Sequence, residues 1–319
     1  MTDTPAHTLV IGTGVMGPSL ALCLALAGHP TALVARRSEA IPEVEAAIET
    51  AFRELAEAEL LPVSAEGWRG RLSFGNDLAA AASDAEFAFE AISEDAEAKQ
   101  ALFVALEAVA PPEAILASTT PGMAVDIIAR KCARKYRVAA AHFANPPHLM
   151  PAVEVVPGSA TDGAIMDRLC AFVHGPGKQP IRLKRDLPGH LFNRLQFALM
   201  REAFALVRNG AADAEDIDKV VKEGYALRLA AEGPLEKADL AGLSLVASVA
   251  QYLYPDLDTS QTPEDLNGMI QDGNSGAKAG RGFFDWTPER SAAVVAERNQ
   301  EVIRHLKRLR ARRGTMQGG

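Results

Sequence analysis

The sequence has few of the residues that build disulfide frameworks or metal sites. Among its 319 residues are only three cysteines, Cys23, Cys132 and Cys170, and they show no metal-type spacing. A sparse, odd-numbered set of this kind argues against a disulfide scaffold and fits a reducing compartment. We therefore expect no metal site, no structural disulfides and a cytoplasmic location.

Long hydrophobic runs are also missing. No span approaches the roughly 18 consecutive apolar residues of a membrane helix. The chain begins with a polar stretch, residues 1–6, that is unlike a secretory signal. No repeat of solenoid period and no low-complexity tract is present. We therefore expect a globular protein that has no membrane partner.

The chain lacks an excess of positive charge. Lysine and arginine number 33 against 41 aspartate and glutamate, which gives a net charge of -8. This balance argues against a general nucleic-acid or anionic-membrane binder, although a local basic pocket for a phosphorylated ligand is compatible with it. A hydrophobic content of 48% and a length sufficient for two domains indicate an ordinary globular protein with a sizeable core.

A glycine motif stands near the start of the chain. The β-type run Thr8–Ile11 leads into Gly12-Thr13-Gly14-Val15-Met16-Gly17, and an apolar helix follows. In such a strand–turn–helix context, Gly12 permits the tight turn, Gly14 lets a pyrophosphate approach the backbone, and Gly17 lets helix and strand pack closely. The helix N-terminus then favours the phosphates. The motif predicts a dinucleotide site across these six residues, the alternative being a glycine-rich turn in another α/β fold.

The second expected strand, Thr31–Val34, ends where the adenosine ribose is usually read. NAD-selective sites commonly place an acid about 20 residues past the glycines. Here the sequence has Ala35, Arg36 and Arg37 instead, and guanidinium groups suit a 2′-phosphate. The pattern favours NADP over NAD, unless the arginines are solvated loop charges and Glu39 serves the ribose.

The first half of the chain alternates between strand and helix patterns. Further strands are expected at 72–74, 87–92 and 114–117, with one helix at 42–61 and another that opens at 93–95 and carries residues 99–109. Parallel strands joined by helices form a doubly wound sheet, and ligands bind beyond the carboxyl ends of its strands. A break at 187–189 precedes a long helical pattern. We predict a Rossmann-type α/β domain over residues 1–186 and an all-α substrate and dimerisation domain over residues 187–319.

One acid lies in an unexpected place. Glu154 interrupts the apolar run 152–156, and a carboxylate in a buried strand is costly without a partner. His142 closes the apolar run 138–141 and is the best partner for it. A carboxylate on one imidazole nitrogen fixes the tautomer and makes the other nitrogen a better base. The remaining histidines lie at element edges, in a proline-rich loop or beside glycines, namely His7, His29, His148, His174, His190 and His305.

Two polar residues complete the expected constellation. Ser118 ends the strand pattern at 114–117, so its hydroxyl is expected at the crevice with His142, although serines at strand ends are also common caps. Asn193 lies in the first turn of the second-half helix, where its amide either points back into the cleft or only satisfies backbone donors.

Four stretches together resemble the L-3-hydroxyacyl-CoA dehydrogenase superfamily: "VIGTGVMG", "AHFANPPHLMPAVEVV", "DLPGHLFNRL" and "GAKAGRGFFDW". The resemblance extends to about Trp286 and is closest to the branch with L-gulonate 3-dehydrogenase, λ-crystallin and carnitine dehydrogenase. It implies a Rossmann-type domain followed by a helical domain that forms a homodimer. By matching position it also implies roles for six residues: His142 as base, Glu154 as its orienting acid, Ser118 and Asn193 on the substrate, and Glu90 and Lys99 beside the cofactor.

The resemblance implies an NAD(P)-dependent oxidoreductase that interconverts a 3-hydroxy acid, or a 3-hydroxyacyl-CoA, and its 3-keto form. Members that use CoA carry a lysine in the loop after the base, whereas 145–151 has none, which favours a smaller free acid. One alternative is a β-hydroxyacid dehydrogenase or imine reductase, which would need a lysine where Gly189 stands. Another is a non-catalytic, crystallin-like nucleotide binder.

Overall fold

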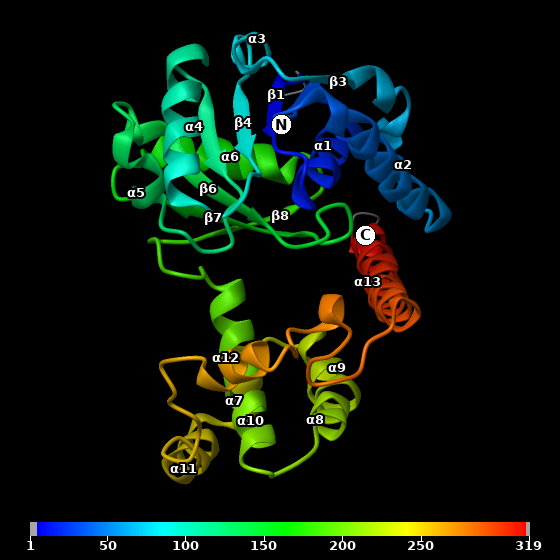
Figure 1. The fold of residues 1–319 in the computed structure, drawn as a ribbon, viewed down its shortest axis with the longest axis vertical. Helices are drawn as coiled ribbons and strands as arrows, with labels where there is room; N and C mark the ends of the chain where they lie inside the picture. The colour runs from blue at the N-terminus through cyan, green and yellow to red at the C-terminus, as the bar shows by residue number, and fades with distance from the viewer. Residues whose placement is uncertain (1–4, 317–319) are drawn as a thin grey trace. The chain divides into compact units, whose positions relative to one another are not determined.

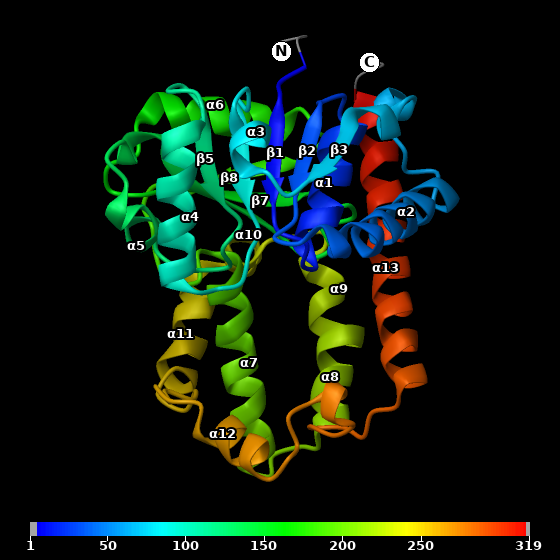
Figure 2. The same cartoon turned by 45° about the horizontal axis from the view of Figure 1, so that its top comes forward.

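The computed structural model describes residues 5–316, with side chains described to residue 311, so part of the polar start at residues 1–6 lies outside it. The chain divides into two compact units (Figures 1 and 2). One is a sheet unit, which extends to Arg194 and resumes at Arg298, and the other is a helical unit, Leu195–Glu297. The sequence placed the division at 186/187, whereas the structure groups residues 187–194 and the later part of the C-terminal helix, from Arg298, with the sheet unit.

The sheet unit contains eight strands. They are β1 (Thr8–Ile11), β2 (Thr31–Val34), β3 (Leu72–Gly75), β4 (Phe87–Glu90), β5 (Ile115–Ser118), β6 (Val138–Phe143), β7 (Ala152–Pro157) and β8 (Gln179–Arg182). Their order is β3-β2-β1-β4-β5-β6-β7-β8, and every neighbouring pair is parallel except β6 and β7. This confirms the predicted Rossmann-type doubly wound sheet.

Helices cover both faces of this sheet (Figure 1). They are α1 (Met16–Leu26), α2 (Ile41–Glu57), α3 (Leu78–Ala82), α4 (Ala96–Val109), α5 (Val125–Ile128) and α6 (Gly163–His174). Side chains alternate between the faces as a strand requires. Val10 of β1 belongs to the core with α1, α2 and α6, whereas Leu9 and Ile11 belong to the core with α3, α4 and α5. Because both faces are covered, the strands are apolar almost throughout.

The helical unit follows the sheet. Its helices are α7 (Phe192–Arg208), which begins in the sheet unit, α8 (Ala214–Val220), α9 (Ala226–Leu229), α10 (Pro234–Ala241), α11 (Leu243–Leu253), α12 (Glu264–Gln271) and the start of α13 (Pro288–Met316). A π-helical turn, Val221–Tyr225, joins α8 to α9. An all-α second half was predicted and is found. Within residues 5–316, no helix combines the length and the apolar character needed to cross a membrane.

Candidate active site

The one antiparallel pairing in the sheet places His142 and Glu154 directly opposite each other. His142 is the fifth residue of β6 and Glu154 the third of β7, and the two are register partners. The His142 Nδ1 atom lies 2.8 Å from Glu154 Oε2. Both residues are buried, His142 to 8% exposure and Glu154 to 3%. The structure therefore brings together the two residues that the sequence paired.

The second oxygen of Glu154 is held by backbone. Oε1 accepts hydrogen bonds from the amides of Leu191 and Phe192, at 2.7 and 2.9 Å. Burial pushes the pKa of Glu154 upward, but the hydrogen bonds from His142 and the two amides outweigh it, so the pKa lies below its ordinary value. The carboxylate is thus ionised and fixed by three donors.

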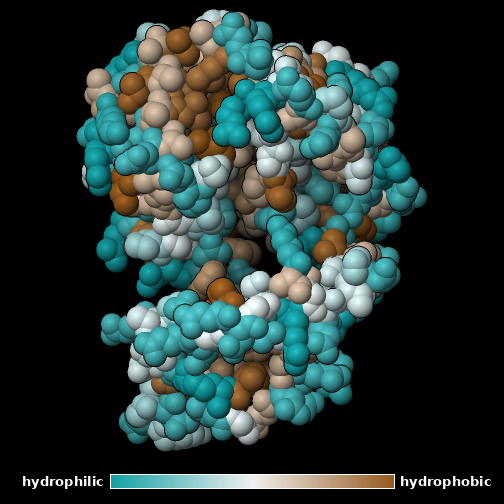
Figure 3. Space-filling view, in the orientation of Figure 1, coloured by the Kyte–Doolittle hydropathy of each residue, from teal (hydrophilic) through white to brown (hydrophobic). Residues whose placement is uncertain are grey.

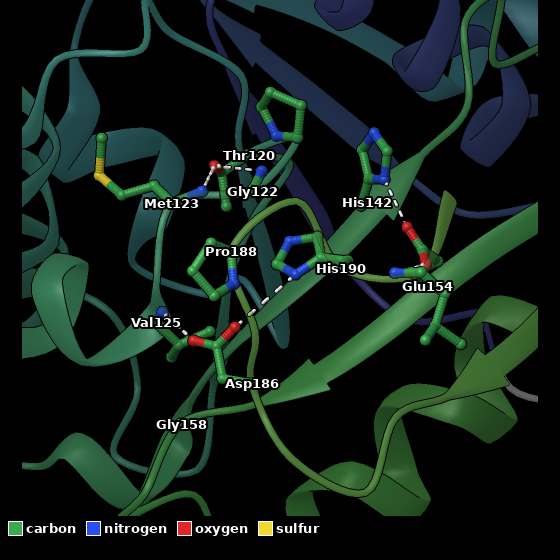
Figure 4. Close-up of polar contacts among 12 residues, drawn as sticks. Thr120, Gly122, Met123, Val125, His142, Glu154, Gly158, Asp186, Pro188 and His190 are labelled. Carbon is green, nitrogen blue, oxygen red and sulfur yellow. Dashed lines mark hydrogen bonds and ion pairs between the residues drawn. The ribbon is translucent and has the colours of Figure 1, made fainter. Parts of the chain in front are cut away.

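A second histidine lies beside this pair (Figure 4). His190 is completely buried, and its ring centroid is 5.8 Å from that of His142. Its Nδ1 atom faces Asp186 Oδ1 at 3.7 Å, too far for a hydrogen bond. The other oxygen of Asp186 accepts the amide of Val125 at 2.6 Å. Two imidazole–carboxylate pairs therefore lie side by side. His142 and Glu154 are hydrogen-bonded, whereas His190 and Asp186 are too far apart for a hydrogen bond.

Ser118 belongs to a different network. Its hydroxyl donates to Glu90 Oε2 at 2.6 Å, and Ser118 is fully buried. Glu90 Oε1 receives the ammonium of Lys99 at 2.7 Å, and Lys99 also lies 3.2 Å from Glu94. The predicted substrate-side serine and the two predicted cofactor-side residues thus form one buried cluster at the ends of β4 and β5.

Asn193 also lies against the segment after β5. Its Nδ2 donates to the carbonyl of Pro121 at 2.7 Å. One residue further on, Gly122 and Gly189 are so close that a Cβ on Gly122 would lie 2.5 Å from the Gly189 nitrogen. The segment just before α7 and the segment carrying Thr120 are therefore packed backbone to backbone, and Asn193 of α7 links them through its side chain.

The glycine motif has the geometry of a dinucleotide turn. Gly12 has φ of +125°, and a Cβ there would lie 2.3 Å from the Ala91 carbonyl oxygen, while a Cβ on Gly17 would lie 2.0 Å from that of Gly12. A Cβ on Gly14 would meet nothing within 4 Å. Val15, the N-cap of α1, supplies no side-chain cap. The first amides of α1 lack a side-chain acceptor, as the pyrophosphate of a dinucleotide requires.

The segment after β2, which is expected to bind the adenosine ribose, is basic and, beyond Ala35, exposed. Ala35, directly after β2, is buried, and its amide is bonded to Gly75. Arg36 and Arg37 are exposed and, within the described part of the chain, neither makes an ion pair or a side-chain hydrogen bond. Glu39 is likewise exposed. The arginine pair and Glu39, which are the two alternatives for contacting the ribose, are therefore both exposed.

Sequence reasoning missed three residues of this region, Asp186, His190 and His148. It assigned the two histidines to a turn and a loop, and it gave Asp186 no role. The only local signal is that His190 follows Asp186 by four residues. Nothing in the sequence indicates that residue 190 lies beside residue 142, because that contact comes from the return of the chain after β8 to the crevice.

The sheet, its glycine turn and the imidazole–carboxylate pair define a Rossmann-type, nicotinamide-dependent oxidoreductase. Residues 7–187 match the NAD binding domain of 3-hydroxyacyl-CoA dehydrogenase, and residues 189–286 match its C-terminal domain. The chain belongs to the 3-hydroxyacyl-CoA dehydrogenase family, which confirms the resemblance seen in its motifs.

Individual relatives match over nearly the whole length. The chain is 31% identical over 304 residues to 5-formyl-3-hydroxy-2-methylpyridine 4-carboxylate 5-dehydrogenase of Mesorhizobium japonicum, covering 92% of this chain and 95% of that one. It is 33% identical over 308 residues to L-carnitine dehydrogenase of Streptomyces coelicolor, covering 94% of each. A crystal structure of the former kind of enzyme, described as an NAD+-dependent dismutase, superposes with a TM-score of 0.89 at 28% identity, covering 96% and 98% of the two chains.

Proposed function

We propose that the protein is an NAD(P)-dependent dehydrogenase that interconverts a small 3-hydroxy acid and its 3-keto form, with His142 as the base. The observation that carries the proposal is the hydrogen-bonded His142–Glu154 pair at the carboxyl edge of the parallel strands. Family membership supports the reaction class. The pair supports the assignment of the base, because a carboxylate on one ring nitrogen leaves the other with the properties of a general base.

The geometry supports a role for each nitrogen of the His142 ring. With Glu154 ionised, the His142 Nδ1 atom carries its hydrogen towards Oε2, so Nε2 is the basic nitrogen. His142 takes the hydroxyl proton of the substrate at Nε2, and Glu154 stabilises the resulting imidazolium. The two amides on Glu154 keep the carboxylate in place while this charge develops. A bound nicotinamide supplies the acceptor of the hydride.

Ser118 and Asn193 are the proposed groups on the substrate side. Each now has a protein partner, Glu90 for Ser118 and the Pro121 carbonyl for Asn193. The amide of Asn193 has a second N–H and an oxygen to offer. Ser118 is fully buried, so it reaches a substrate only if its bond to Glu90 is exchanged. Glu90 and Lys99 are proposed to line the nicotinamide side.

For the cofactor, we propose a preference for NADP over NAD. The family binds NAD, and the glycine turn serves either dinucleotide equally. The preference is supported by Arg36 and Arg37, which are exposed and unpaired within the described residues, where NAD-selective sites usually place an acid. Glu39 is the group that would favour NAD.

For the substrate, we propose a free acid rather than an acyl-CoA. The loop at 145–151 carries no lysine of its own. The cation that reaches it, Lys178, is 6% exposed and donates to the carbonyls of Pro147 and Met150, so it is not available to a CoA phosphate.

A second candidate reaction is the oxidation of an aldehyde that carries a carboxylate. It is favoured by the end-to-end match to the pyridine aldehyde dehydrogenase relative. The hydrate of an aldehyde has an O–H and a C–H on one carbon, so the same base can take the proton. Loss of that proton and of a hydride to NAD+ leaves a carboxylic acid, which balances the reaction.

We also propose a homodimer formed through the helical unit, in the reducing cytoplasm. The three cysteines are all free thiols, which supports that compartment. The support for the dimer is the small core of the helical unit. Only Ala205 and Ile217 are buried there among residues 195–297, and hydrophobic residues reach its surface (Figure 3).

The deciding experiment measures initial rates with NADH and NADPH separately against acetoacetate, acetoacetyl-CoA and a pyridine aldehyde carboxylate. We expect turnover of the free keto acid, faster with NADPH. Fast turnover of the thioester would overturn the free-acid proposal, and oxidation of the aldehyde with NAD(P)+ would select the second candidate. Cofactor binding without turnover of any of them would favour a non-catalytic binder.

The roles of His142 and Glu154 are tested by substitution. His142→Ala should lower kcat by roughly 10²- to 10⁴-fold. Glu154→Gln should lower it comparably, because an amide N–H facing Nδ1 forces the hydrogen onto Nε2. Glu107→Gln is the matched control, since Glu107 also accepts two backbone amides, those of residues 133 and 134. Activity of His142→Ala near that of the wild type would sink the assignment.

A further inference from the structure

The loop that joins β6 to β7 is anchored by a histidine. Residues 144–151 connect the strand that carries His142 to the strand that carries Glu154. His148 lies in this loop, and its side chain is 8% exposed. It contacts two helices on the cofactor side of the sheet unit, α1 and α2. Its position therefore connects the candidate base pair to the candidate dinucleotide site.

All polar atoms of His148 except its carbonyl are engaged. Its amide donates to Ser19 Oγ at 3.0 Å, Nδ1 lies 2.8 Å from the same Oγ, and Nε2 lies 2.7 Å from Glu54 Oε2. The opposite oxygen of Glu54 accepts the side-chain amide of Asn299 at 2.7 Å. The loop is thereby tied to α1, α2 and α13.

The direction of each hydrogen bond follows from the protonation state of the His148 ring. Burial lowers the pKa of His148, and the hydrogen bond and charge of Glu54 only partly offset this, so the ring is neutral near pH 7. A neutral ring beside a carboxylate must place its hydrogen on Nε2, towards Glu54. Nδ1 is then an acceptor, and Ser19 donates its hydroxyl to it while accepting the amide of His148. The tautomer and the ring orientation are both fixed.

Ser19 connects this loop to the part of α1 that is expected to bind the dinucleotide. It is the fourth residue of α1, two residues after Gly17, and is 7% exposed. The first turn of α1 is the expected seat of the pyrophosphate. A bond from this turn to the 144–151 loop therefore spans the distance between the cofactor's phosphates and the strands that carry the base.

We propose that His148 is a positioning residue that holds the His142–Glu154 strands in register with the dinucleotide-binding helix α1. The inference rests on the proposed function. It goes beyond it in giving a role to a residue that touches neither the base nor the glycine turn. A shift of about 1 Å between reacting groups costs up to roughly 100-fold in rate, so the anchor has a measurable effect on turnover.

The loop does not depend on His148 alone for its fold. Lys178 donates to the carbonyls of Pro147 and Met150 and holds the same loop independently of the His148 ring. Variants of His148 should therefore fold, with the loop in place but released from α1. This separates a loss of positioning from a loss of structure.

The test uses a graded set of variants. His148→Phe removes both ring bonds. His148→Asn retains an acceptor near Nδ1 for Ser19, and His148→Gln retains a donor near Nε2 for Glu54. Ser19→Ala removes the partner on α1. Thr8→Val is the matched control, because Thr8 is buried and hydrogen-bonded to Thr31 at the far end of β1.

We measure Tm, the Kd of NADH by fluorescence, and kcat for each variant on the best substrate of the panel. We expect His148→Phe to lower kcat about 10- to 100-fold with an unchanged Kd for NADH, and to raise the primary isotope effect of deuterated cofactor. The single-bond variants should fall between it and the wild type. His148→Gln combined with Ser19→Ala should be no slower than Ser19→Ala alone, since Ser19→Ala already removes the Ser19–ring bond that His148→Gln removes.

A lower Tm with wild-type kcat in the folded enzyme, as expected of Thr8→Val, would overturn the inference. Failure of the proposed function is distinguishable, because the wild type itself would then bind NADH without turning over any substrate. In that case the fluorescence lifetime of bound NADH tests the anchor instead of kcat. A change in His148→Phe but not in Thr8→Val supports the anchor, and no change in either overturns it.

Discussion

At the scale of single residues, His190 is held in an unfavourable conformation. Its φ of +49° lies in the left-handed region, which costs a residue with a Cβ about 1–2 kcal/mol. It is completely buried, and neither ring nitrogen has a hydrogen-bond partner within the described residues. Strain and an unpaired polar group at one position, beside a candidate base, are typical of functional sites.

His190 should make the stability of the protein depend on pH. Burial lowers its pKa and the charge of His142 lowers it further, while the charges of Asp186 and Glu154 and the nearby backbone of Thr120 raise it in part. Because the folded-state pKa lies below the unfolded value of about 6.5, the unfolded chain binds more protons below that pH, and stability falls as the pH falls. We expect His190→Asn, which tolerates a left-handed φ, to reduce the loss of Tm between pH 7.5 and 5.5.

Thermal unfolding at several pH values measures this dependence. The matched control is His174→Asn, which replaces an exposed histidine whose side chain makes no ion pair or hydrogen bond within the described residues. An identical pH dependence for His190→Asn and the wild type would show that His190 does not titrate in this way.

At the scale of elements, the β1–turn–α1 unit is constrained by close backbone packing at its glycines. Two of its glycines lie against backbone oxygens, whereas the third faces open space. The same residue type therefore serves two purposes, close packing at Gly12 and Gly17 and access at Gly14. This difference in packing agrees with the separate roles that the motif predicts for the three glycines.

Alanine at each glycine should separate these purposes. Gly12→Ala and Gly17→Ala should destabilise the fold by about 1–3 kcal/mol or more, because backbone must move to admit a Cβ. Gly14→Ala should leave the free energy of unfolding nearly unchanged but weaken the binding of NADH. Urea unfolding and NADH titration measure the two effects. Unchanged NADH affinity in Gly14→Ala would contradict the close approach of a pyrophosphate.

The sequence was most informative where a pattern is local. Strands β1 and β2 were predicted with the bounds found, and the strand expected at 87–92 is two residues longer than β4. The contact of His142 and Glu154 could be predicted because a carboxylate within an apolar strand needs a partner. The bonds of Ser118 to Glu90 and of His148 to Ser19 could not, because they join residues 28 and 129 positions apart. Such contacts depend on strand order and loop paths rather than on local composition.

At the scale of the whole molecule, the two units differ in how much they bury. The sheet unit has two continuous cores on the faces of its sheet. The helical unit exposes large apolar side chains on most of its helices, for example Leu235 at 81% and Leu240 at 76% on α10. Large exposed apolar surfaces are typical of interfaces, and this one is the observation on which the proposed homodimer rests.

We expect sedimentation or light scattering to give a mass of two chains. Leu235→Glu together with Leu240→Glu should shift the protein towards one chain, because charges in an apolar interface remain unpaired. Val63→Glu is the control, since Val63 is a fully exposed apolar residue of the sheet unit. A wild-type protein that stays monomeric at high concentration would contradict the proposal.

On the proposed preference for NADP, Arg36 and Arg37, which are unpaired among the described residues, should make the choice of cofactor sensitive to ionic strength. They are exposed charges on a protein of net charge -8, so their attraction for a 2′-phosphate acts through solvent. At 0.1 M salt such interactions are screened over about 10 Å. A chain of this kind would discriminate for the phosphorylated cofactor strongly in dilute buffer and weakly in concentrated salt. On this proposal, cofactor specificity is set by the surrounding medium as well as by the residues of the chain.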